Sequence, residues 1–197
     1  MKFLAPFVLC LFALSALAVE AGSRAVEATL LIDDFTAKNG KSQFGTNWEF
    51  FADTVMGGRS SGNAQPMTWG GRRCLRLRGD VSLENRGGFI QTRLPLADSR
   101  KTFDAGDFRG VQFWAKGNGE RYEIHLRTAN TWLPWQYYAA GFEAKDKWTL
   151  VKLPFSDFKG FSIGRDLNYK RLSTVGMVAI KKAFKADAAI SDLEFYR

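Results

Sequence analysis

DTVMGGRS (residues 53–60) and GDVSLENRGGFIQ (residues 79–91) are the two stretches of this 197-residue chain that decide its fold. Each contains a pair of glycines, Gly57-Gly58 in the first stretch and Gly87-Gly88 in the second. Glycine reaches positive φ at no steric cost, so such a pair beside polar cap residues indicates a backbone corner that other residues would strain. We expect each corner to open a strand, the second of them at Phe89.

The first corner has an alternative interpretation as a phosphate-binding loop, because glycine-rich loops can cradle anions with backbone amides. The GxxxxGK[ST] spacing is missing, however, and neither a helical pattern nor a βαβ unit surrounds the glycines. We therefore expect a structural role, in which Gly57-Gly58 turns the chain and the side chains of Asp53 and Ser60 hydrogen-bond nearby backbone.

The rest of the chain is dominated by strands with one apolar and one polar face. Residues 111–116 and 121–127 alternate between the two kinds of side chain. Further strand candidates, separated by turn residues such as Asn39-Gly40 and Gly70-Gly71, cover residues 29–35, 48–51, 75–78, 87–94, 136–142, 148–155, 174–180 and 190–196. About ten short strands without an internal repeat predict an all-β antiparallel sandwich, with one short helical turn near residues 168–172.

The two glycine corners together resemble the complex I intermediate-associated protein 30 family. The resemblance covers roughly residues 29–196 and includes Trp48 upstream and, downstream, Trp148, Val151, Leu153, Pro154, Phe155 and Phe158. It implies a jelly-roll β-sandwich of the galactose-binding-like type and chaperone-like help in building a membrane respiratory complex. It also implies a structural, non-catalytic role for the family's signature residues, which here are Asp53, Gly57, Gly58, Ser60, Gly87, Gly88 and Phe89.

The N-terminus has the features of a secretory signal peptide over residues 1–18. Lys2 is followed by an apolar run that ends at Leu14, and Ala16-Leu17-Ala18 is a small-x-small cleavage site. The apolar run is too short for a membrane-spanning helix of about 20 residues. We expect a flexible segment over residues 19–28 and a single domain over residues 29–197, in a periplasmic or secreted monomer without a transmembrane segment after cleavage.

The charge and the rare residue types narrow the possible functions. Lys and Arg number 28 against 20 Asp and Glu, a net charge of +8 that favours anionic partners. The basic residues are scattered along the chain, so we expect no nucleic acid and take a protein or a glycan as the partner. His125 is the only histidine and Cys74 the only cysteine after cleavage, which excludes multi-histidine metal sites, cysteine clusters and an internal disulfide.

No catalytic residues are expected. The chain has no GxSxG nucleophile motif, and His125 lies within an alternating strand. We therefore predict that the protein is not an enzyme and has no cofactor. Cys74 is either a buried apolar residue or a free thiol.

One metal site remains as an alternative. Four carboxylates flank the first and last strands, which often lie side by side in jelly rolls, and could converge on a Ca²⁺ ion: Asp33, Asp34, Asp192 and Glu194. Because Asp residues more often cap turns and backbone groups than bind Ca²⁺, we expect no metal.

Side chains on the polar faces of two neighbouring strands suggest a binding site. Gln112 and Trp114 lie on the polar face of one strand, and His125 and Arg127 on the polar face of the next. The connection over residues 117–120 is short enough for a hairpin, which would bring these four side chains onto one outer face. Alternatively, Trp114 covers the edge of a sheet.

A second aromatic cluster lies around Pro134, in a loop and the strand after it, and consists of Trp132, Trp135, Tyr137 and Tyr138. Exposed aromatic rings beside polar groups can hold sugars or peptides by stacking and hydrogen bonding. The sequence thus predicts an exported, non-catalytic binding module with a chaperone-like or assembly role toward a protein or membrane complex. The alternative function is a carbohydrate-binding module of the galactose-binding-like type.

Overall fold

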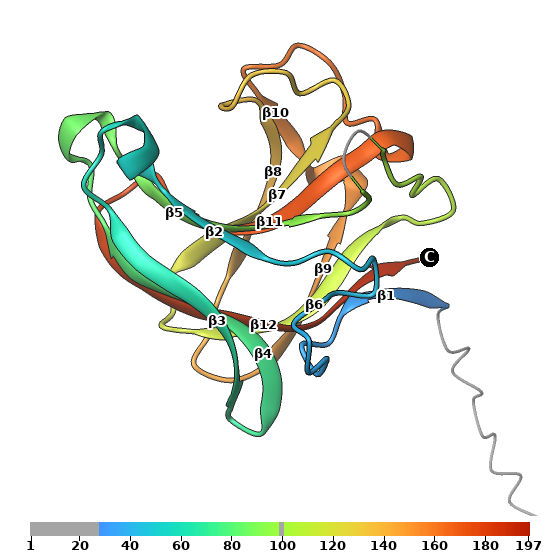
Figure 1. Ribbon diagram of the computed structural model, residues 1–197, viewed down its shortest axis with the longest axis horizontal. Helices are drawn as coiled ribbons and strands as arrows, with labels where there is room; N and C mark the ends of the chain where they lie inside the picture. Colours follow the sequence, from blue (N-terminus) through green and yellow to red (C-terminus); the bar gives the residue numbers. More distant parts are fainter. Residues whose placement is uncertain (1–27, 99–100) are drawn as a thin grey trace, which may run out of the picture.

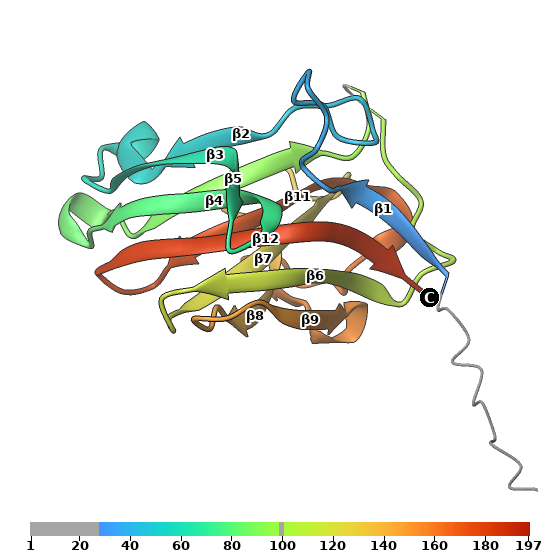
Figure 2. The same ribbon diagram turned by 90° about the horizontal axis from the view of Figure 1, so that it is seen from below.

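Two antiparallel sheets lie face to face in the computed structural model, which describes residues 28–98 and 101–197 (Figures 1 and 2). The first sheet has the spatial order β3 (Ser61–Trp69), β4 (Arg72–Val81), β12 (Phe184–Tyr196), β6 (Gly110–Gly117) and β9 (Thr149–Pro154), and β1 (Thr29–Asp33) also pairs with β12. The second sheet has the order β10 (Lys159–Phe161), β8 (Tyr137–Glu143), β7 (Arg121–Thr128), β11 (Leu172–Ile180), β5 (Phe89–Pro95) and β2 (Glu49–Ala52). The signal peptide expected over residues 1–18 and nearly all of the segment expected over residues 19–28 lie outside the described residues.

The core lies between the two sheets because the alternating strands turn their apolar faces toward each other. Phe113 and Phe195 from the first sheet and Tyr122 and Tyr138 from the second are among its largest fully buried side chains. The all-β antiparallel jelly-roll β-sandwich is therefore confirmed. So is the helical turn near residues 168–172, which is the 3₁₀ turn η4 (Tyr169–Arg171).

Two strands have no counterpart among the expected ones, and β12 begins earlier than expected. β3 is an edge strand with mostly exposed side chains and a proline, so it lacks an alternating apolar pattern. β10 is only three residues long. The first half of β12 continues the pairing with β4 through Phe184 to Ile190, whereas the expected strand started at residue 190.

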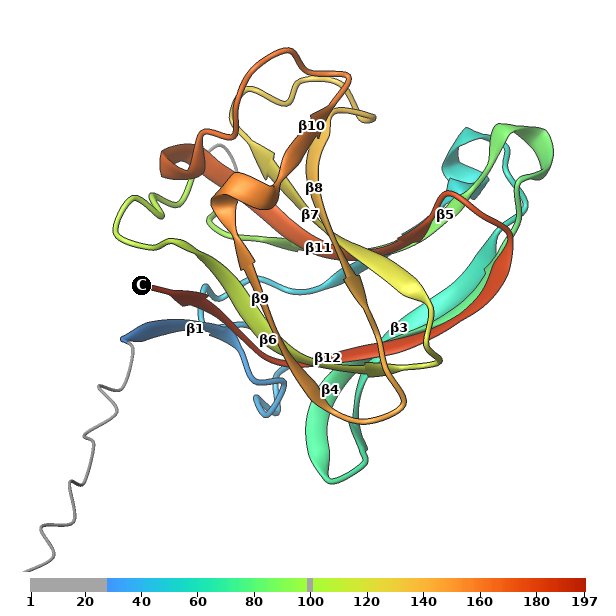
Figure 3. The same cartoon turned by 180° about the vertical axis from the view of Figure 1, so that it is seen from behind.

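The hairpin expected between residues 110–117 and 121–128 is wrong. β6 belongs to the first sheet and β7 to the second, so the short connection between them crosses from one sheet to the other (Figure 3). The connection is held by a different part of the chain, because the backbone N–H groups of Gly117 and Gly119 donate to the carbonyls of Lys145 and Ala144. Alternation shows which face of a strand is buried but not which sheet the strand joins.

The carboxylate of Asp53 connects the two glycine corners. Its Oδ1 accepts from the Ser60 N–H at 2.8 Å, and its Oδ2 accepts from the N–H groups of Gly88 at 2.6 Å and Phe89 at 3.3 Å. The Ser60 hydroxyl donates to the same carboxylate. Asp53 is fully buried at the start of the 3₁₀ turn η1 (Asp53–Met56), beside the turn η2 (Glu84–Arg86) at one end of the sandwich (Figure 1).

The glycines at these corners are required for two different reasons. Gly57 and Gly88 have positive φ, of 86° and 140°, as expected for corner glycines. Gly58 and Gly87 do not, and the expectation of positive φ is wrong for them. A Cβ atom on either of these two residues would overlap the Asp53 carboxylate.

Replacing Gly58 by alanine should therefore displace Asp53. We expect Gly58→Ala to lower the free energy of unfolding by about 1–3 kcal/mol, because the carboxylate must leave buried donors unpaired. Gly164→Ala is the matched control, since its Cβ would meet no atom within 4 Å and its φ is not positive. Urea unfolding measures both variants, and equal midpoints would contradict this role of Gly58.

The charge of Asp53 should matter as much as its shape. Burial alone would raise the pKa of Asp53, but the hydrogen bonds from Ser60, Gly88 and Phe89 outweigh burial and hold the pKa below its usual value. This stabilisation is present above the pKa of the unfolded chain, near 3.9, and is lost as the pH falls through the folded value.

We expect Asp53→Asn to lower the free energy of unfolding at pH 7 by about 2–3 kcal/mol, because an amide N–H₂ would face buried donors. The exposed pair of Asp80 with Lys185 offers a control, and Asp80→Asn should change stability by less than about 1 kcal/mol. Thermal melts of the two variants test the difference. An Asp53→Asn protein that melts with the parent would refute the structural role of the charge.

Candidate functional site

Three stacked rings cross the outer face of the second sheet. Phe161 on β10 stacks on Tyr137 on β8, with ring centroids 5.0 Å apart, and Tyr137 stacks on His125 on β7 at 3.9 Å. The interplanar angles are 8° and 12°, so the rings are nearly parallel. Alternation turns Tyr137 and His125 outward because their neighbours Tyr138 and Leu126 point into the core. We call these three residues the ring stack.

A small hollow of about 40 Å³ adjoins the ring stack at His125. Its wall comes from four strands and one loop: Gln91, Thr92, Arg93, His125, Arg127, Pro134, Tyr137, Thr174 and Gly176. Gly176 lies opposite His125 in the pairing of β11 with β7. A Cβ at Gly176 would overlap the Thr92 carbonyl oxygen, so this position of the wall is kept free of a side chain.

The loop over residues 129–136, here named the aromatic loop, borders both the hollow and the ring stack. Arg127 holds this loop through its guanidinium, which donates to the carbonyls of Leu133 at 2.9 Å and Pro134 at 3.2 Å. The loop presents Trp132 and Trp135 to solvent with exposed fractions of 82% and 51%. The two tryptophans of the predicted cluster around Pro134 are thus on the surface, next to the predicted Arg127, whereas Tyr138 is buried.

Gln136 fixes the loop to the segment that follows Phe161. Its Oε1 accepts from the backbone N–H groups of Trp132 and Leu133, and its Nε2 donates to the Ser162 carbonyl at 3.1 Å. Sequence reasoning missed Gln136 and Phe161 as part of the site, since Phe161 lies in a stretch expected to be a loop. The stacked pair of rings on neighbouring strands becomes visible only from the register of β10 with β8.

His125 is neutral in this setting. Its side chain is only 8% exposed, and its Nε2 lies 2.8 Å from a carboxylate oxygen of Glu123, which also pairs with Lys181. Burial lowers the pKa of His125 despite the nearby Glu123 carboxylate. Burial, followed by the charge of Glu123, also raises the pKa of Tyr137 to about 12. The ring stack therefore consists of uncharged rings at neutral pH.

Gln112 and Trp114 lie on the other side of the molecule. They occupy the outer face of the first sheet, so the expected juxtaposition with His125 and Arg127 is wrong. The Arg72 guanidinium covers the Trp114 ring at 4.2 Å from its centroid and pairs with Asp192 at 2.9 Å. Gln112 donates to Glu194 at 2.7 Å. Trp114 thus lies under Arg72 on the outer face of β6, an interior strand of the first sheet and not an edge strand.

The four carboxylates considered for Ca²⁺ are taken up by other partners, although β1 and β12 do lie side by side. Asp33 accepts from the Phe35 N–H and from Trp48 Nε1, Asp34 accepts from the Thr36 N–H, and Asp192 and Glu194 have the partners named above. Over residues 28–98 and 101–197 there is no group of three or more His, Cys, Asp or Glu that could hold a metal ion. The Ca²⁺ alternative gains no support from this geometry.

Cys74 is fully buried, with its Sγ 3.4 Å from the Met67 carbonyl oxygen. Burial raises the pKa of its thiol. A buried, protonated thiol is a poor nucleophile, which favours the apolar role of Cys74 over the reactive one.

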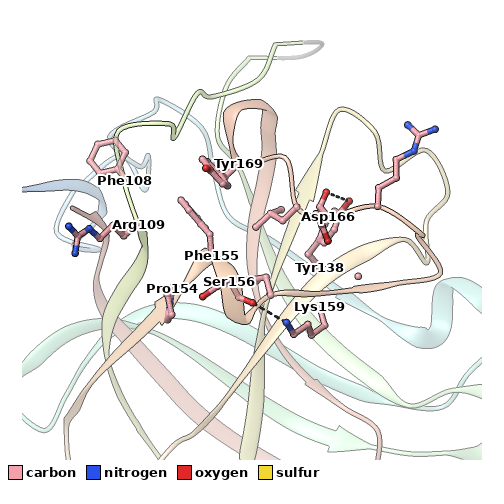
Figure 4. A pocket seen from close by; sticks show the side chains of 13 residues that line it. Phe108, Arg109, Tyr138, Pro154, Phe155, Ser156, Lys159, Asp166 and Tyr169 are labelled. Atoms are coloured by element: carbon pink, nitrogen blue, oxygen red, sulfur yellow. Dashed lines mark hydrogen bonds between the residues drawn. The ribbon is translucent and has the colours of Figure 1, made fainter.

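A larger cavity, of about 590 Å³, lies beside β9 and β10 (Figure 4). Two of its polar groups are bound within the protein, since the Tyr138 hydroxyl donates to the Asp166 carbonyl and Lys159 Nζ to the Ser156 carbonyl. Figure 4 shows the Arg109 side chain turned away from the cavity. The cavity has the size of a ligand pocket, but we place the candidate site on the ring stack, because three parallel rings there end at the exposed Phe161 on an open sheet face.

The described residues contain no helix of the length and hydrophobicity needed to cross a membrane.

Comparison with known families gives one match over most of the chain. The family model of Complex I intermediate-associated protein 30 matches residues 34–189.

Several solved structures with the same fold are carbohydrate-binding modules. The family 11 module of the cellulosomal cellulase Lic26A-Cel5E of Clostridium thermocellum superposes with a TM-score of 0.66 at 12% identity, over 87% of this chain and 96% of the module. The family 11 module from Clostridium thermocellum in complex with a β-1,3-1,4-mixed-linked tetrasaccharide gives 0.65 at 12% identity, over 85% and 95%. The family 30 module of the cellulosomal cellulase Cel9D-Cel44B of Clostridium thermocellum gives 0.51 at 18% identity, over 68% and 80%. Identities this low show the shared fold alone.

A shorter match relates 99 residues, at 30% identity, to the pyridoxal 5'-phosphate synthase subunit PdxS of Hyperthermus butylicus. It covers 48% of this chain and spans only 30% of the length of that protein, and it shows no family.

The lowered pKa of His125 predicts a pH dependence of stability. In the unfolded chain this histidine takes up a proton near pH 6.5, whereas the folded chain takes it up only at lower pH. The unfolded state therefore binds more protons as the pH falls below about 6.5, and the free energy of unfolding falls by up to about 1.4 kcal/mol per pH unit.

His125→Gln should reduce that slope between pH 6.5 and 5.5, because His125 is the only histidine in the chain. Urea unfolding at several pH values measures the slope in both proteins. Identical slopes would show that the protonation of His125 is not linked to folding.

Proposed function

The chain belongs to the complex I intermediate-associated protein 30 family, and we propose that it is a non-catalytic module that binds a glycan on the ring stack of its second sheet. The observation that carries this proposal is the continuous stack of Phe161, Tyr137 and His125 beside the polar hollow. Sugars have apolar C–H faces that pack on aromatic rings and hydroxyls that hydrogen-bond to fixed polar groups.

The surroundings of the ring stack fit a sugar ligand. Phe161 is 50% exposed at one end of the stack, and the side chains of Gln91 and Thr174 line the hollow at the other. Trp132 and Trp135 of the aromatic loop extend the apolar surface, so a chain of more than one sugar could lie along it. The solved complex of a family 11 module with a tetrasaccharide shows that a module of this fold can bind glycans, which supports a search among them.

The charges on this face favour binding over hydrolysis. Glycoside hydrolysis needs an acid and a base about 5–10 Å apart across the scissile bond. Glu123 is bound by His125 and Lys181, and Glu49 is paired with Arg93 at 2.7 Å. Neither carboxylate is placed as an isolated acid or base beside the rings.

A second candidate function is an assembly or chaperone-like interaction with a protein or membrane complex, as the family's name suggests. The exposed Trp132, Leu133, Trp135 and Phe161 would provide an apolar contact surface for a protein partner. For either function, we propose that the protein is a monomer that is secreted or located in the periplasm.

Phe161→Ala should weaken glycan binding at least tenfold, because it removes the exposed end of the ring stack, about 1.4 kcal/mol of binding free energy. Trp114→Ala is the control, since that tryptophan lies on the opposite face. A glycan array identifies the ligand, and isothermal titration measures the affinities.

If a folded Phe161→Ala protein keeps its full affinity, the glycan-binding site is not on this face. If no glycan binds while membrane proteins co-purify from native membranes, the assembly function is the better one, and loss of that co-purification in Phe161→Ala would place it on the same surface.

A further inference from the structure

We infer that the hollow beside the ring stack holds the carboxylate of a uronic acid, so that the glycan of the proposed function is an acidic one. This inference rests on the proposed glycan-binding function. It depends on three features of the hollow: two arginines in its lining, one of them without a counter-ion among the described residues, and a small volume.

Arg93 from β5 and Arg127 from β7 both line the hollow. Arg127 forms no ion pair within residues 28–98 and 101–197, because its hydrogen bonds end on neutral oxygens of Thr131, Leu133 and Pro134. Burial, followed by repulsion from Arg93, lowers the pKa of Arg127. Both arginines thus line one small hollow, and Arg127 has no counter-ion among the described residues.

Arg93 is held in place while part of its guanidinium stays available. Its Nε and Nη2 donate to one oxygen of Glu49 at 3.2 and 2.7 Å, and the guanidinium lies 4.4 Å from the Phe51 ring centroid. The N–H groups of Nη1 have no partner among the described residues. Glu49 is half exposed at the edge strand β2, where an ion pair contributes little and a ligand carboxylate can compete with it.

The size of the hollow selects a small anionic group. Its volume of about 40 Å³ is a few times the roughly 10–15 Å³ that a cavity needs to hold one water molecule, so a whole sugar ring does not fit inside it. A planar carboxylate does, and it matches the donor geometry of a guanidinium. Gln91 and Thr174 would add neutral hydrogen-bonding groups beside the carboxylate.

Matched pairs of ligands test the carboxylate directly. The probes are oligogalacturonate and oligomannuronate, each with its methyl-esterified form, which has the same sugar backbone without the charge. We expect at least one acid to bind tenfold or more tightly than its ester at 50 mM salt, measured by isothermal titration. Sulfated galactan oligosaccharides serve as the anionic comparison.

Variants of the Arg93–Glu49 pair assign the difference to the hollow. Arg93→Gln should remove most of the preference for the acid, so that the acid and its ester bind about equally. Glu49→Gln is the matched control and should keep or increase the preference, because it removes the competing carboxylate. Arg93 is chosen over Arg127 because a substitution of Arg127 would release the aromatic loop, and circular dichroism confirms the fold of each variant.

The outcomes separate this inference from the function on which it rests. Equal binding of acid and ester, a preference for the sulfated ligand, or an acid preference that survives in Arg93→Gln overturns the carboxylate assignment, while ester binding that needs Phe161 upholds the glycan-binding function. If none of these glycans binds and the glycan array is also silent, the function fails and the inference fails with it.

Discussion

The buried carboxylate of Asp53 is the interaction on which the two ends of the fold depend. It collects donors from Ser60, which precedes β3 of the first sheet, and from Gly88 and Phe89, where β5 of the second sheet begins. A buried carboxylate without a counter-ion is costly unless donors surround it, and here four N–H and O–H groups do so. The glycine corner therefore resembles an anion-binding loop for a physical reason: its amides already bind an anion, and that anion is the chain's own side chain.

The position of the candidate binding face follows from this anchor. The Phe89 N–H that donates to Asp53 is the first of β5, and alternation from Phe89 turns Gln91 and Arg93 to the outer face. The pairing of β5 with β11, and of β11 with β7, then brings Arg93 and Arg127 to the same hollow, where Thr174 pairs with Arg127 and Gly176 with His125. A shift of one residue at the corner would turn Arg93 into the core, so the site depends on the register that Asp53 helps to set.

The sequence predicted where the strands of this fold lie better than it predicted which strands pair with each other. Alternation identified β6 and β7 with their buried faces, yet the short connection at residues 117–120 gave no sign that it crosses between sheets, because both strands would look the same in a hairpin. The aromatic loop was predicted from Trp132 and Trp135, and His125 and Arg127 were named, whereas Phe161 was expected in a loop. Gln91 and Arg93 occupy polar positions of an ordinary strand, and only cross-strand pairing brings them to the hollow.

The two outer faces show how similar residues acquire different roles. On the first sheet, Arg72 and Arg76 cover Trp114 and Trp69 at 4.2 and 3.8 Å from their ring centroids, and carboxylates of Asp192 and Asp187 neutralise both arginines. The rings there are covered, and the charges are satisfied. On the second sheet the rings stack on one another and end at the exposed Phe161, and Arg127 faces the hollow without a carboxylate. An excess of positive charge favours an anionic ligand only where the fold leaves a charge uncompensated beside an accessible surface, and the hollow meets both conditions.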